Sequence, residues 1–519
     1  MTMTLTRISR QAAGWTLLLL FGLGTWMSLT ILTGADSVAV GWGNLVRFIE
    51  RVGSLDFPPL GEILSLSAMT MAIVILGTLL AAVLSIPVAW ASASNTTPGP
   101  VWRIVGRLTG VIARAVPDVV LAMVFALMLP FGAMPGILAF GLHSVGMISR
   151  LFADAIEQSD PGPRLAIRAA GGSRLQEFTA GVLPQVFPSW VATTIHRADI
   201  NLRGSVILGY AGVAGLGLAM RGAFATLDYA RGLAIAVIML MLCIVMEVIS
   251  SAARRRLLGV GRSRGGGRRL GPGVVIGLVV ALVAGSAWVC RLSLRDLGAL
   301  WSRGPTVARS FWPPNAGSYG MGRFLAAMGT TLGIALAAVA VCLVGSLVLG
   351  SFAARNVAPR PWIRTGCRGV LVVVRALPEL VVAIVLIVVT GLGAPAGTLA
   401  LGVCGIGLLG KLLADSLEEN PPGPEQALRA TGASRAQVYA GATLPLARRA
   451  VIGHVFYLLD TNIRAATILG VVGGGGIGYH LLTASQGGRY GQVTLIVGMI
   501  IVAVLAVEGL AIWTRSALR

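Results

Sequence analysis

The strongest constraint on the fold of this chain is an internal repeat that covers most of its length. The segment DPGPRLAIRAAGGSRLQEFTAGVLPQ at 160–185 returns as NPPGPEQALRATGASRAQVYAGATLPL at 420–446. Thr331 lies 261 positions after Thr70, Gly478 lies 261 positions after Gly217, and the same offset holds between them without a gap. A gap-free match of this length indicates duplication, so the two halves are expected to share one fold.

The composition of the chain indicates a membrane environment. Of its 519 residues, 55% are hydrophobic and only 12% are charged. Each half contains six apolar runs, and about 20 apolar residues are enough to cross the ~30 Å core of a bilayer. The runs lie at 15–32, 63–90, 104–129, 134–151, 186–208 and 232–249, and then at 274–289, 324–352, 370–389, 396–413, 452–469 and 493–513. The sequence therefore predicts an all-α polytopic membrane protein with about twelve transmembrane helices.

The repeat also predicts how the chain is divided. We expect a first half at 1–252, a basic cytoplasmic linker at 253–272 and a second half at 273–519. Six spans per half would give the two halves the same orientation, as in transporters built from parallel repeats. The run at 15–32 could be a signal peptide, but its counterpart at 274–289 is internal, so we interpret it as a retained span.

The net charge of +21 fits a membrane topology better than a nucleic-acid interface. The arginines lie between apolar runs instead of on one soluble face. Counting from a cytoplasmic N-terminus places the linker, the C-terminus and the polar loops at 158–182 and 419–443 inside, as the positive-inside rule requires. Lipid or nucleic-acid binding is the alternative for the linker arginines. The outside loop from Arg291 to Arg323 is also basic, so it could face an anionic partner or substrate.

Each of the two polar loops is expected to hold a short helix across the inner face of the membrane. Prolines at 161–163 and 421–424 end the preceding span, because proline cannot continue a helix. Gly171 and Gly432 then permit a turn. Ser173 and Ser434 are suited to cap the next helix. A helix tied in this way to two spans would act as a lever for a partner that pushes on it.

Taken together, these loops resemble the cytoplasmic signature of the inner-membrane permeases of ATP-binding-cassette (ABC) importers. The stretches ALRATGASR at 427–435 and DTNIRAATILGVVGGGGIG at 460–478 narrow the resemblance to the phosphonate-type permeases. It covers nearly the whole chain twice, which implies two fused permease halves of type I importer architecture. The Glu of the family motif falls on Leu165 in the first loop and on Gln426 in the second, whereas Glu425 is one position away.

The resemblance implies a set of partners. Two ATPase subunits would dock on the two loops and would bind the ATP and Mg, with no cofactor in this chain. The residues implied in this coupling are Arg168, Gly171, Ser173, Arg174, Arg429, Gly432, Ser434 and Arg435. An extracytoplasmic solute-binding protein would deliver the substrate, and the chain would lie in the cytoplasmic membrane of a bacterium.

A second pair of matched motifs places charges inside predicted spans. Asp199 and Arg203 are four residues apart, as are Asp460 and Arg464, so each pair could be an ion pair on one helix face. Charges at this depth are expensive and usually face a cavity. We therefore also expect Arg203 and Arg464 to line the substrate path, because a guanidinium binds phosphonate or phosphate oxygens in pairs. Asn201 and Asn462 would add neutral donors.

Glycines follow each charged span. Gly212 and Gly215, and likewise Gly473 and Gly476, are expected to break the helix and to act as a gate or a re-entrant turn. Close helix packing through small residues is the alternative interpretation. Matched prolines at Pro117 and Pro378 are expected to kink a span.

Other motifs carry little weight. The stretch from Gly405 to Lys411 fits the first part of a phosphate-binding loop, but Leu412 follows where Ser or Thr is needed, and the stretch is apolar. The five cysteines and four histidines form no matched set, so neither a metal site nor a catalytic centre is predicted.

The sequence therefore predicts a permease that moves a phosphonate or a related phosphorus oxyanion. Phosphate, phosphite and an amino acid are the alternative substrates. An ion-coupled secondary carrier with six plus six spans is a different class, but it would not need matched lever loops. A membrane-embedded enzyme would need a nucleophile or metal set that the repeat does not contain.

Overall fold

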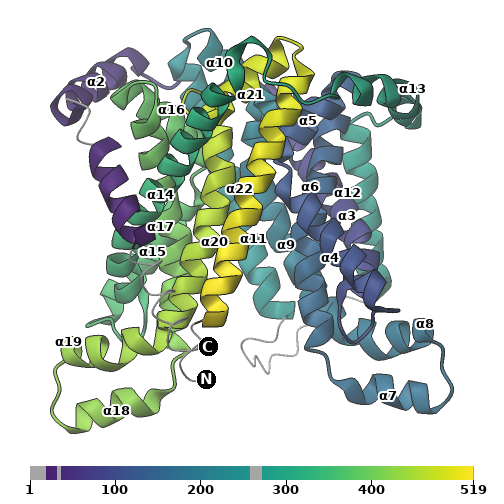
Figure 1. Ribbon diagram of the computed structural model, residues 1–519, viewed down its shortest axis with the longest axis vertical. Helices are drawn as coiled ribbons and strands as arrows, with labels where there is room; N and C mark the ends of the chain where they lie inside the picture. Colours follow the sequence, from purple (N-terminus) through teal and green to yellow (C-terminus); the bar gives the residue numbers. More distant parts are fainter. Residues whose placement is uncertain (1–18, 32–36, 258–271, 518–519) are drawn as a thin grey trace. The chain divides into compact units, whose positions relative to one another are not determined.

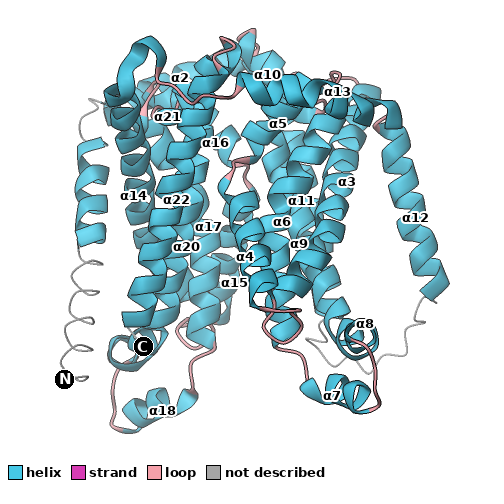
Figure 2. Ribbon diagram, turned by 45° about the vertical axis from the view of Figure 1, so that its right-hand side comes forward, coloured by secondary structure: helices cyan, strands magenta, loops and turns pink. Residues whose placement is uncertain are grey.

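Helices form every regular element in the part of the chain that the structure describes, which is 19–31, 37–257 and 272–517 of a computed structural model (Figure 1; Figure 2). Both ends of the chain and residues 258–271, which make up most of the predicted linker, lie outside the described residues. The predicted all-α class is confirmed.

The chain divides by its contacts into two compact units. The first-repeat unit is Ser54–Arg309, and the second-repeat unit combines Ser310–Arg519 with Met1–Gly53. These units differ from the sequence halves at 1–252 and 273–519, because the first helices of each repeat pack with the other repeat. The sequence halves reflect the duplication, whereas the compact units reflect which helices pack together.

Three packing contacts account for this exchange of helices between the repeats. The helix α2 (Ser37–Val52) packs on α16 (Glu379–Thr390), and α12 (Pro272–Val289) packs on α3 (Leu60–Ser92). The helix at Leu19–Ile31 packs on α14 so closely that a Cβ at Gly24 would lie 2.8 Å from the carbonyl oxygen of Leu336.

After this exchange each helix of the first-repeat unit has a counterpart in the second, which contains one further short helix, η2. The first-repeat unit continues with α4 (Pro100–Ala115), α5 (Asp118–Met128), α6 (Met134–Glu157), α7 (Pro161–Ala169), α8 (Arg174–Gln176), the π-helix η1 (Glu177–Val182), α9 (Leu183–Tyr210), α10 (Leu216–Ala225), α11 (Tyr229–Leu257) and, after α12, α13 (Leu294–Ser310). The second-repeat unit contains the 3-10 helix η2 (Gly317–Tyr319), α14 (Gly320–Ala353), α15 (Pro361–Ala376), α16, α17 (Ala394–Glu418), α18 (Pro422–Ala430), α19 (Arg435–Val438), the π-helix η3 (Tyr439–Thr443), α20 (Leu444–Val471), α21 (Ile477–Gln486) and α22 (Tyr490–Ala517).

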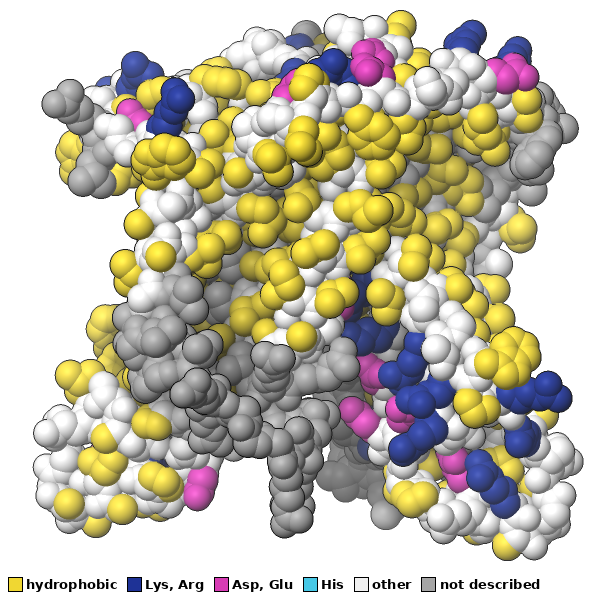
Figure 3. All heavy atoms as spheres, turned by 180° about the vertical axis from the view of Figure 1, so that it is seen from behind, with side chains coloured by type: hydrophobic (Ala, Val, Ile, Leu, Met, Phe, Trp, Pro, Cys, Tyr) yellow, Lys and Arg dark blue, Asp and Glu magenta, His cyan; other side chains and the backbone are white. Residues whose placement is uncertain are grey.

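Six of these helices are long and apolar enough to cross a membrane, and they are α3, α6, α11, α14, α17 and α22. Hydrophobic side chains accordingly cover the middle of the face shown in Figure 3. The pairs α4–α5 and α15–α16 would raise the number to eight, and they bend by 85° and 86°. Their bends fall at Pro117 and Pro378, so the predicted kinks are confirmed. The other four predicted spans are also helical, but they are not among the helices that are long and apolar enough to cross a membrane. Two of them, α9 and α20, carry charges, and the helices at 19–31 and 279–289 are short. The total of about twelve spans stays a prediction.

An aromatic core fixes the loop of the first repeat to its membrane helices. Phe152 of α6 and Trp190 of α9 stack with their ring centroids 4.4 Å apart. Phe178 and Val182 of the π-helix η1 are buried in the same cluster. The segment between the short helix and the span is therefore packed against the bundle, so that a displacement of the loop would move α6 and α9 with it.

Candidate functional site

The two polar loops have the local structure that their sequences predict. They occupy the 25 residues between Glu157 and Leu183 and the equivalent stretch between Glu418 and Leu444. We call them the first and the second coupling loop. The short helices α7 and α18 are present, and Gly171 and Gly432 follow them with φ of +80° and +83°.

The serine caps are also confirmed. Ser173 accepts a hydrogen bond from the backbone N–H of Gln176, and the side chain of Gln176 accepts one from the backbone N–H of Ser173. Ser434 and Gln437 form the same capping box in the second loop. Each box satisfies two backbone donors at a helix start, which fixes the direction in which the chain re-enters the bundle.

One of two matched arginines ties each coupling loop to a turn between two earlier helices of its repeat. Arg174 donates to the carbonyl oxygen of Pro98 at 2.9 Å, in the turn between α3 and α4. Arg435 donates to the carbonyl oxygen of Pro359 at 3.1 Å, in the turn between α14 and α15. The structure shows that these two residues brace the loop internally, and their contact with an ATPase stays a prediction.

The other matched arginines form ion pairs within their loops. Arg168 lies 2.9 Å from Glu177, and Arg429 lies 3.7 Å from Glu425. Both arginine side chains are more than half exposed, at 59% and 56%. They can therefore hold the loop together and still reach a partner.

The carboxylate that holds each loop occupies a different position in the two repeats. Glu425 is buried and accepts hydrogen bonds from Asn356 Nδ2 and Thr443 Oγ1, each at 2.8 Å. Its counterpart in the first loop is Arg164, which donates to the carbonyl oxygen of Asn95. The carboxylate of the first loop comes from Glu177, four residues after the capping Ser173, whereas Glu425 directly follows Pro424. Although the family motif is altered, each loop therefore contains a carboxylate that pairs with one of its arginines.

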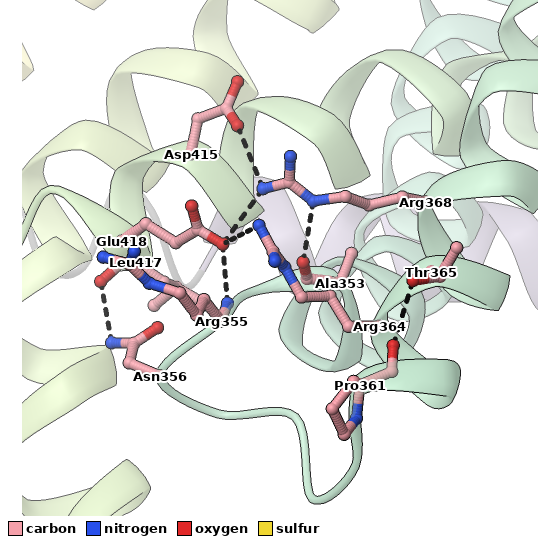
Figure 4. Close-up of polar contacts among 10 residues, drawn as sticks. All are labelled: Ala353, Arg355, Asn356, Pro361, Arg364, Thr365, Arg368, Asp415, Leu417 and Glu418. Carbon is pink, nitrogen blue, oxygen red and sulfur yellow. Dashed lines mark hydrogen bonds and ion pairs between the residues drawn. The ribbon is translucent and has the colours of Figure 1, made fainter. Parts of the chain in front are cut away.

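The turns that receive these arginines are themselves fixed to the bundle. In the second repeat, Glu418 accepts from the backbone N–H of Arg355 at 2.6 Å and from Arg368 at 3.0 Å, and Arg364 lies 3.5 Å from it (Figure 4). Asn356 donates to the carbonyl oxygen of Leu417 at 2.9 Å.

The first repeat keeps the same arrangement. Glu157 accepts from the backbone N–H of Ser94 at 2.7 Å, and Asn95 donates to the carbonyl oxygen of Ile156 at 2.8 Å. We call each set the bracket of its loop. Sequence reasoning missed the brackets, although the exact match of Asn95 with Asn356 across the repeat was a signal for them.

The two charged pairs inside α9 and α20 are ion pairs, as one interpretation of the sequence expected. Arg203 pairs with Asp199, and Arg464 lies 3.0 Å from Asp460. The exposure of the partners is inverted. In α9 the Asp side chain is 1% exposed and the Arg 19%, whereas in α20 the Asp is 17% exposed and the Arg 8%. The guanidinium of Arg203 is therefore the more accessible of the two.

The matched asparagines have different surroundings. Asn201 is buried, accepts from Ser144 at 3.2 Å and donates to Thr78 at 3.0 Å, while the buried Arg197 donates to Ser144 at 2.9 Å. Its amide is thus hydrogen-bonded within the first-repeat unit, and its role in the substrate path stays a prediction.

In the second repeat, Leu458, Gly405 and Val339 replace the partners of this network. The Nδ2 of the buried Asn462 has no hydrogen-bond partner among the described residues. The two halves therefore differ in how firmly their charged helix is fixed at this level.

The glycine clusters break the helices in both repeats. Gly212, Gly215, Gly473 and Gly476 all have positive φ, at +88°, +121°, +106° and +78°. A Cβ at Gly476 would lie 2.3 Å from Thr331 Oγ1, which accepts a hydrogen bond from the backbone N–H of Ile477 at 2.8 Å. Thr70 accepts from Leu216 in the same way, at 2.9 Å. Each break is thus held against the first long helix of its repeat.

Close packing accompanies the helix breaks. A Cβ at Gly478 would lie within 2 Å of a carbonyl oxygen in α20, and one at Gly209 would lie 2.1 Å from Gly217. Both interpretations of these glycines therefore describe the geometry, and the gate stays a prediction.

Other candidate sites find no structural support in the described residues. There, no group of three or more His, Cys, Asp or Glu side chains is placed to hold a metal ion. The stretch from Gly405 to Lys411 lies inside α17 and forms no loop.

Comparisons with known proteins place these features in a family. The model of the family described as "Binding-protein-dependent transport system inner membrane component" matches the chain twice, at residues 85–259 and 346–514. The two matches begin 261 positions apart, which is the offset of the internal repeat.

Individual relatives agree with this match. The chain is 40% identical over 486 residues to the phosphate-import permease protein PhnE of Mycolicibacterium smegmatis, which covers 92% of this chain and 90% of that protein. It is 38% identical over 186 residues to the phosphite transport system permease protein PtxC of Stutzerimonas stutzeri, or 36% of this chain and 68% of that protein. A chain of the MetNI methionine ABC transporter in an inward-facing structure is 20% identical, with a TM-score of 0.34 over 38% of this chain and 98% of that chain.

Proposed function

Because this chain belongs to the family of inner membrane components of binding-protein-dependent transport systems, we propose that it is the permease of an ABC importer for a phosphorus oxyanion, with two permease halves fused in one chain. The observation that carries the proposal is the 40% identity to a phosphate-import permease along 92% of the chain. The phosphite permease relative points to the same class of anion. Phosphate, phosphite and alkylphosphonates share the tetrahedral oxyanion that a guanidinium recognises.

The partners follow from the family and from the duplicated loops. Two ATPase subunits dock on the two coupling loops and bind the ATP and Mg, and a solute-binding protein delivers the anion from outside. The permease halves at 1–252 and 273–519 lie in the cytoplasmic membrane of a bacterium with both termini in the cytoplasm. Membrane lipid surrounds the spans, and nucleic acid is no partner.

The coupling step depends on the rigidity of the loops. Closure of the ATPases pushes α7 and α18, whose exposed faces include Leu165, Gln426, Arg168 and Arg429. Arg174 and Arg435 pass the displacement to the turns at Pro98 and Pro359, and the brackets pass it to the ends of α6 and α17. The spans move as a consequence, and the glycine breaks act as the gate.

Within the path, we assign the anion contact to the paired arginines. Asp199 and Asp460 orient Arg203 and Arg464, and the side chain of Arg203, which is 19% exposed, is the more accessible of the two to the cargo. A carboxylate beside each guanidinium also limits the affinity for an anion. Weak attraction suits a permease, since a tight site would not release its cargo.

The experiment that tests this function is ATP-driven uptake into proteoliposomes that contain the chain, its ATPase and its solute-binding protein. The panel is methylphosphonate, phosphate, phosphite and methionine. We expect uptake of at least one phosphorus oxyanion and none of methionine. Uptake of methionine alone would overturn the anion assignment while leaving the importer class intact. Uptake that persists without ATP would overturn the ABC importer itself.

A further inference from the structure

A cluster of aromatic and basic side chains lies at the end of the second-repeat unit that is farthest along α14 from its coupling loop. Tyr319 lies at the start of α14, whereas the turn that contacts the coupling loop follows its last residue, Ala353. At 34 residues and about 1.5 Å per residue, α14 separates the two by about 50 Å. The cluster therefore lies at the opposite end of this unit from α18.

Two guanidinium groups share one aromatic ring in this cluster. The Cζ atoms of Arg323 and Arg489 lie 4.9 Å and 5.1 Å from the centroid of Tyr319. His480 of α21 lies 6.2 Å from Tyr319 and 5.5 Å from Phe324, centroid to centroid. We call Tyr319, Arg323, His480 and Arg489 the basic cluster.

The charge of the basic cluster is uncompensated within the part of the chain that the structure describes. Neither arginine forms an ion pair with a described carboxylate. Burial and the nearby Arg323 guanidinium lower the pKa of His480. Two exposed or half-exposed guanidinium groups on a tyrosine thus offer several unused hydrogen-bond donors.

The corresponding place in the first repeat has the opposite charge. The positions that match Arg323 and Arg489 are Glu62 and Asp228. Arg231 lies 3.0 Å from Glu62 and 3.8 Å from Asp56, and its backbone N–H donates to Asp228 at 3.0 Å. Two carboxylates thus lie beside one half-exposed guanidinium, and a third lies beside the backbone of the same arginine. We call Asp56, Glu62, Asp228 and Arg231 the acidic cluster.

The opposite charges distinguish between possible occupants. A site that gathers an anionic cargo, or that binds anionic lipid headgroups, would gain from positive charge in both repeats, and the carboxylates of the acidic cluster would repel either. A protein surface carries charges of both signs, and charge complementarity fixes its orientation. Tyrosine and arginine are also the side chains that most often dominate the energy of protein interfaces.

We propose that the basic cluster is a docking site for carboxylates on the solute-binding protein. This inference rests on the proposed function, which requires that partner. The acidic cluster has the opposite charge at the matched place, so the two repeats offer different surfaces to a protein partner. Arg303 and Arg309 of α13 add positive charge to the first-repeat unit but belong to neither cluster.

The test uses the full chain with its ATPase in lipid nanodiscs and titrates the purified solute-binding protein while ATP hydrolysis is measured. For R323E combined with R489E, we expect the half-saturating concentration of the solute-binding protein to rise at least about tenfold at low salt, because interface charges govern association. The matched control is R303E combined with R309E, which changes the charge by the same amount elsewhere and should shift this concentration less than about twofold. Co-purification of the ATPase shows that each variant is folded.

The design separates failure of the inference from failure of the function. If the wild-type complex shows no uptake that depends on the solute-binding protein, the proposed function fails. If the wild type is active and R323E/R489E has a wild-type half-saturating concentration, the docking inference is wrong. A raised KM for cargo at saturating solute-binding protein would assign the cluster to the anion. A new dependence of activity on anionic lipid would assign the cluster to the membrane. Either result, without a shift in the half-saturating concentration, overturns the inference. An equal shift in both double variants overturns it as well.

Discussion

At the scale of single residues, the arginines of the duplicated motif make contacts within the protein. Arg174 and Arg435 donate to turn carbonyls, and Arg168 and Arg429 pair with carboxylates of their own loops. These contacts make each loop rigid, in addition to any surface that the motif offers to a partner. The carboxylate that pairs with the loop arginine lies at a different position in each repeat, at Glu177 in the first and at Glu425 in the second.

Removal of the buried carboxylate should loosen the second coupling loop. In Glu425→Ala, the donors of Asn356 and Thr443 lose their acceptor, and an unsatisfied buried group costs about 1–3 kcal/mol. We expect faster amide exchange across 420–443 and transport reduced severalfold, with the ATPase still bound. The neighbouring exposed Gln426→Ala should leave exchange unchanged. Equal exchange in the two variants would show that Glu425 does not hold the loop.

The paired arginines in α9 and α20 allow a test of the path. Arg203→Ala combined with Arg464→Ala should abolish uptake while the complex with the ATPase still assembles. Arg203→Ala alone should have the larger effect of the two single changes, because its side chain is 19% exposed against 8% for Arg464. Uptake at the wild-type rate in the double variant, measured in proteoliposomes, would assign both arginines to structural ion pairs.

At the scale of elements, the broken helices depend on backbone conformations that only glycine adopts without strain. Gly476 has a φ of +78° and lies against Thr331, which caps α21. Gly215 has the same relation to Thr70 and α10. The helix break and the long helix beside it therefore form one unit in each repeat.

Substitution at the break should be costly. Gly476→Ala places a Cβ 2.3 Å from Thr331 Oγ1 in a left-handed conformation, and strain of that kind costs about 1–3 kcal/mol. We expect a lower melting temperature and loss of uptake. Gly453→Ala is the matched control, because it lies within α20 with open space around its Cβ, and it should be neutral or stabilising. Thermal unfolding of both variants in detergent compares them directly.

At the scale of the whole molecule, the two repeats exchange their first helices. Residues 1–53 belong to the second-repeat unit, and α12 packs on α3 of the first. Each unit therefore takes part of its packing surface from the other half of the sequence. A fused chain keeps the two different halves paired, which also keeps their unlike charged clusters in one molecule.

This exchange predicts how a divided chain behaves. Fragments 1–257 and 272–519 expressed together should co-purify and restore uptake, because the packing between them does not need the peptide connection. Either fragment expressed alone should accumulate poorly, since apolar faces such as that of α3 lose their neighbour. Fragment 54–257 expressed with 272–519 should give less complex, because α16 loses its contact with α2. Stable accumulation of a single fragment would contradict the exchange.

The sequence alone determined much of this protein. The apolar runs and the period of 261 residues predicted the helices. The positions of proline, glycine and serine predicted the limits of both coupling loops, their caps and the bends at Pro117 and Pro378. Such features are local, because proline, glycine and capping serine act on their own backbone. The Asp–Arg spacing likewise predicted the ion pairs, since four residues make one turn of a helix.

Only the tertiary structure decided what depends on contacts between distant segments. The bond from Arg174 to Pro98 joins residues 76 positions apart, and the exchange of α2 and α12 crosses the repeat boundary. The placement of Asn201 in a buried network and the gathering of Arg323, Arg489 and His480 around Tyr319 are of the same kind. Sequence spacing fixes neighbours within one helix. The packing of one helix against another depends on the surfaces that they bury together, and no local pattern states which surfaces those are.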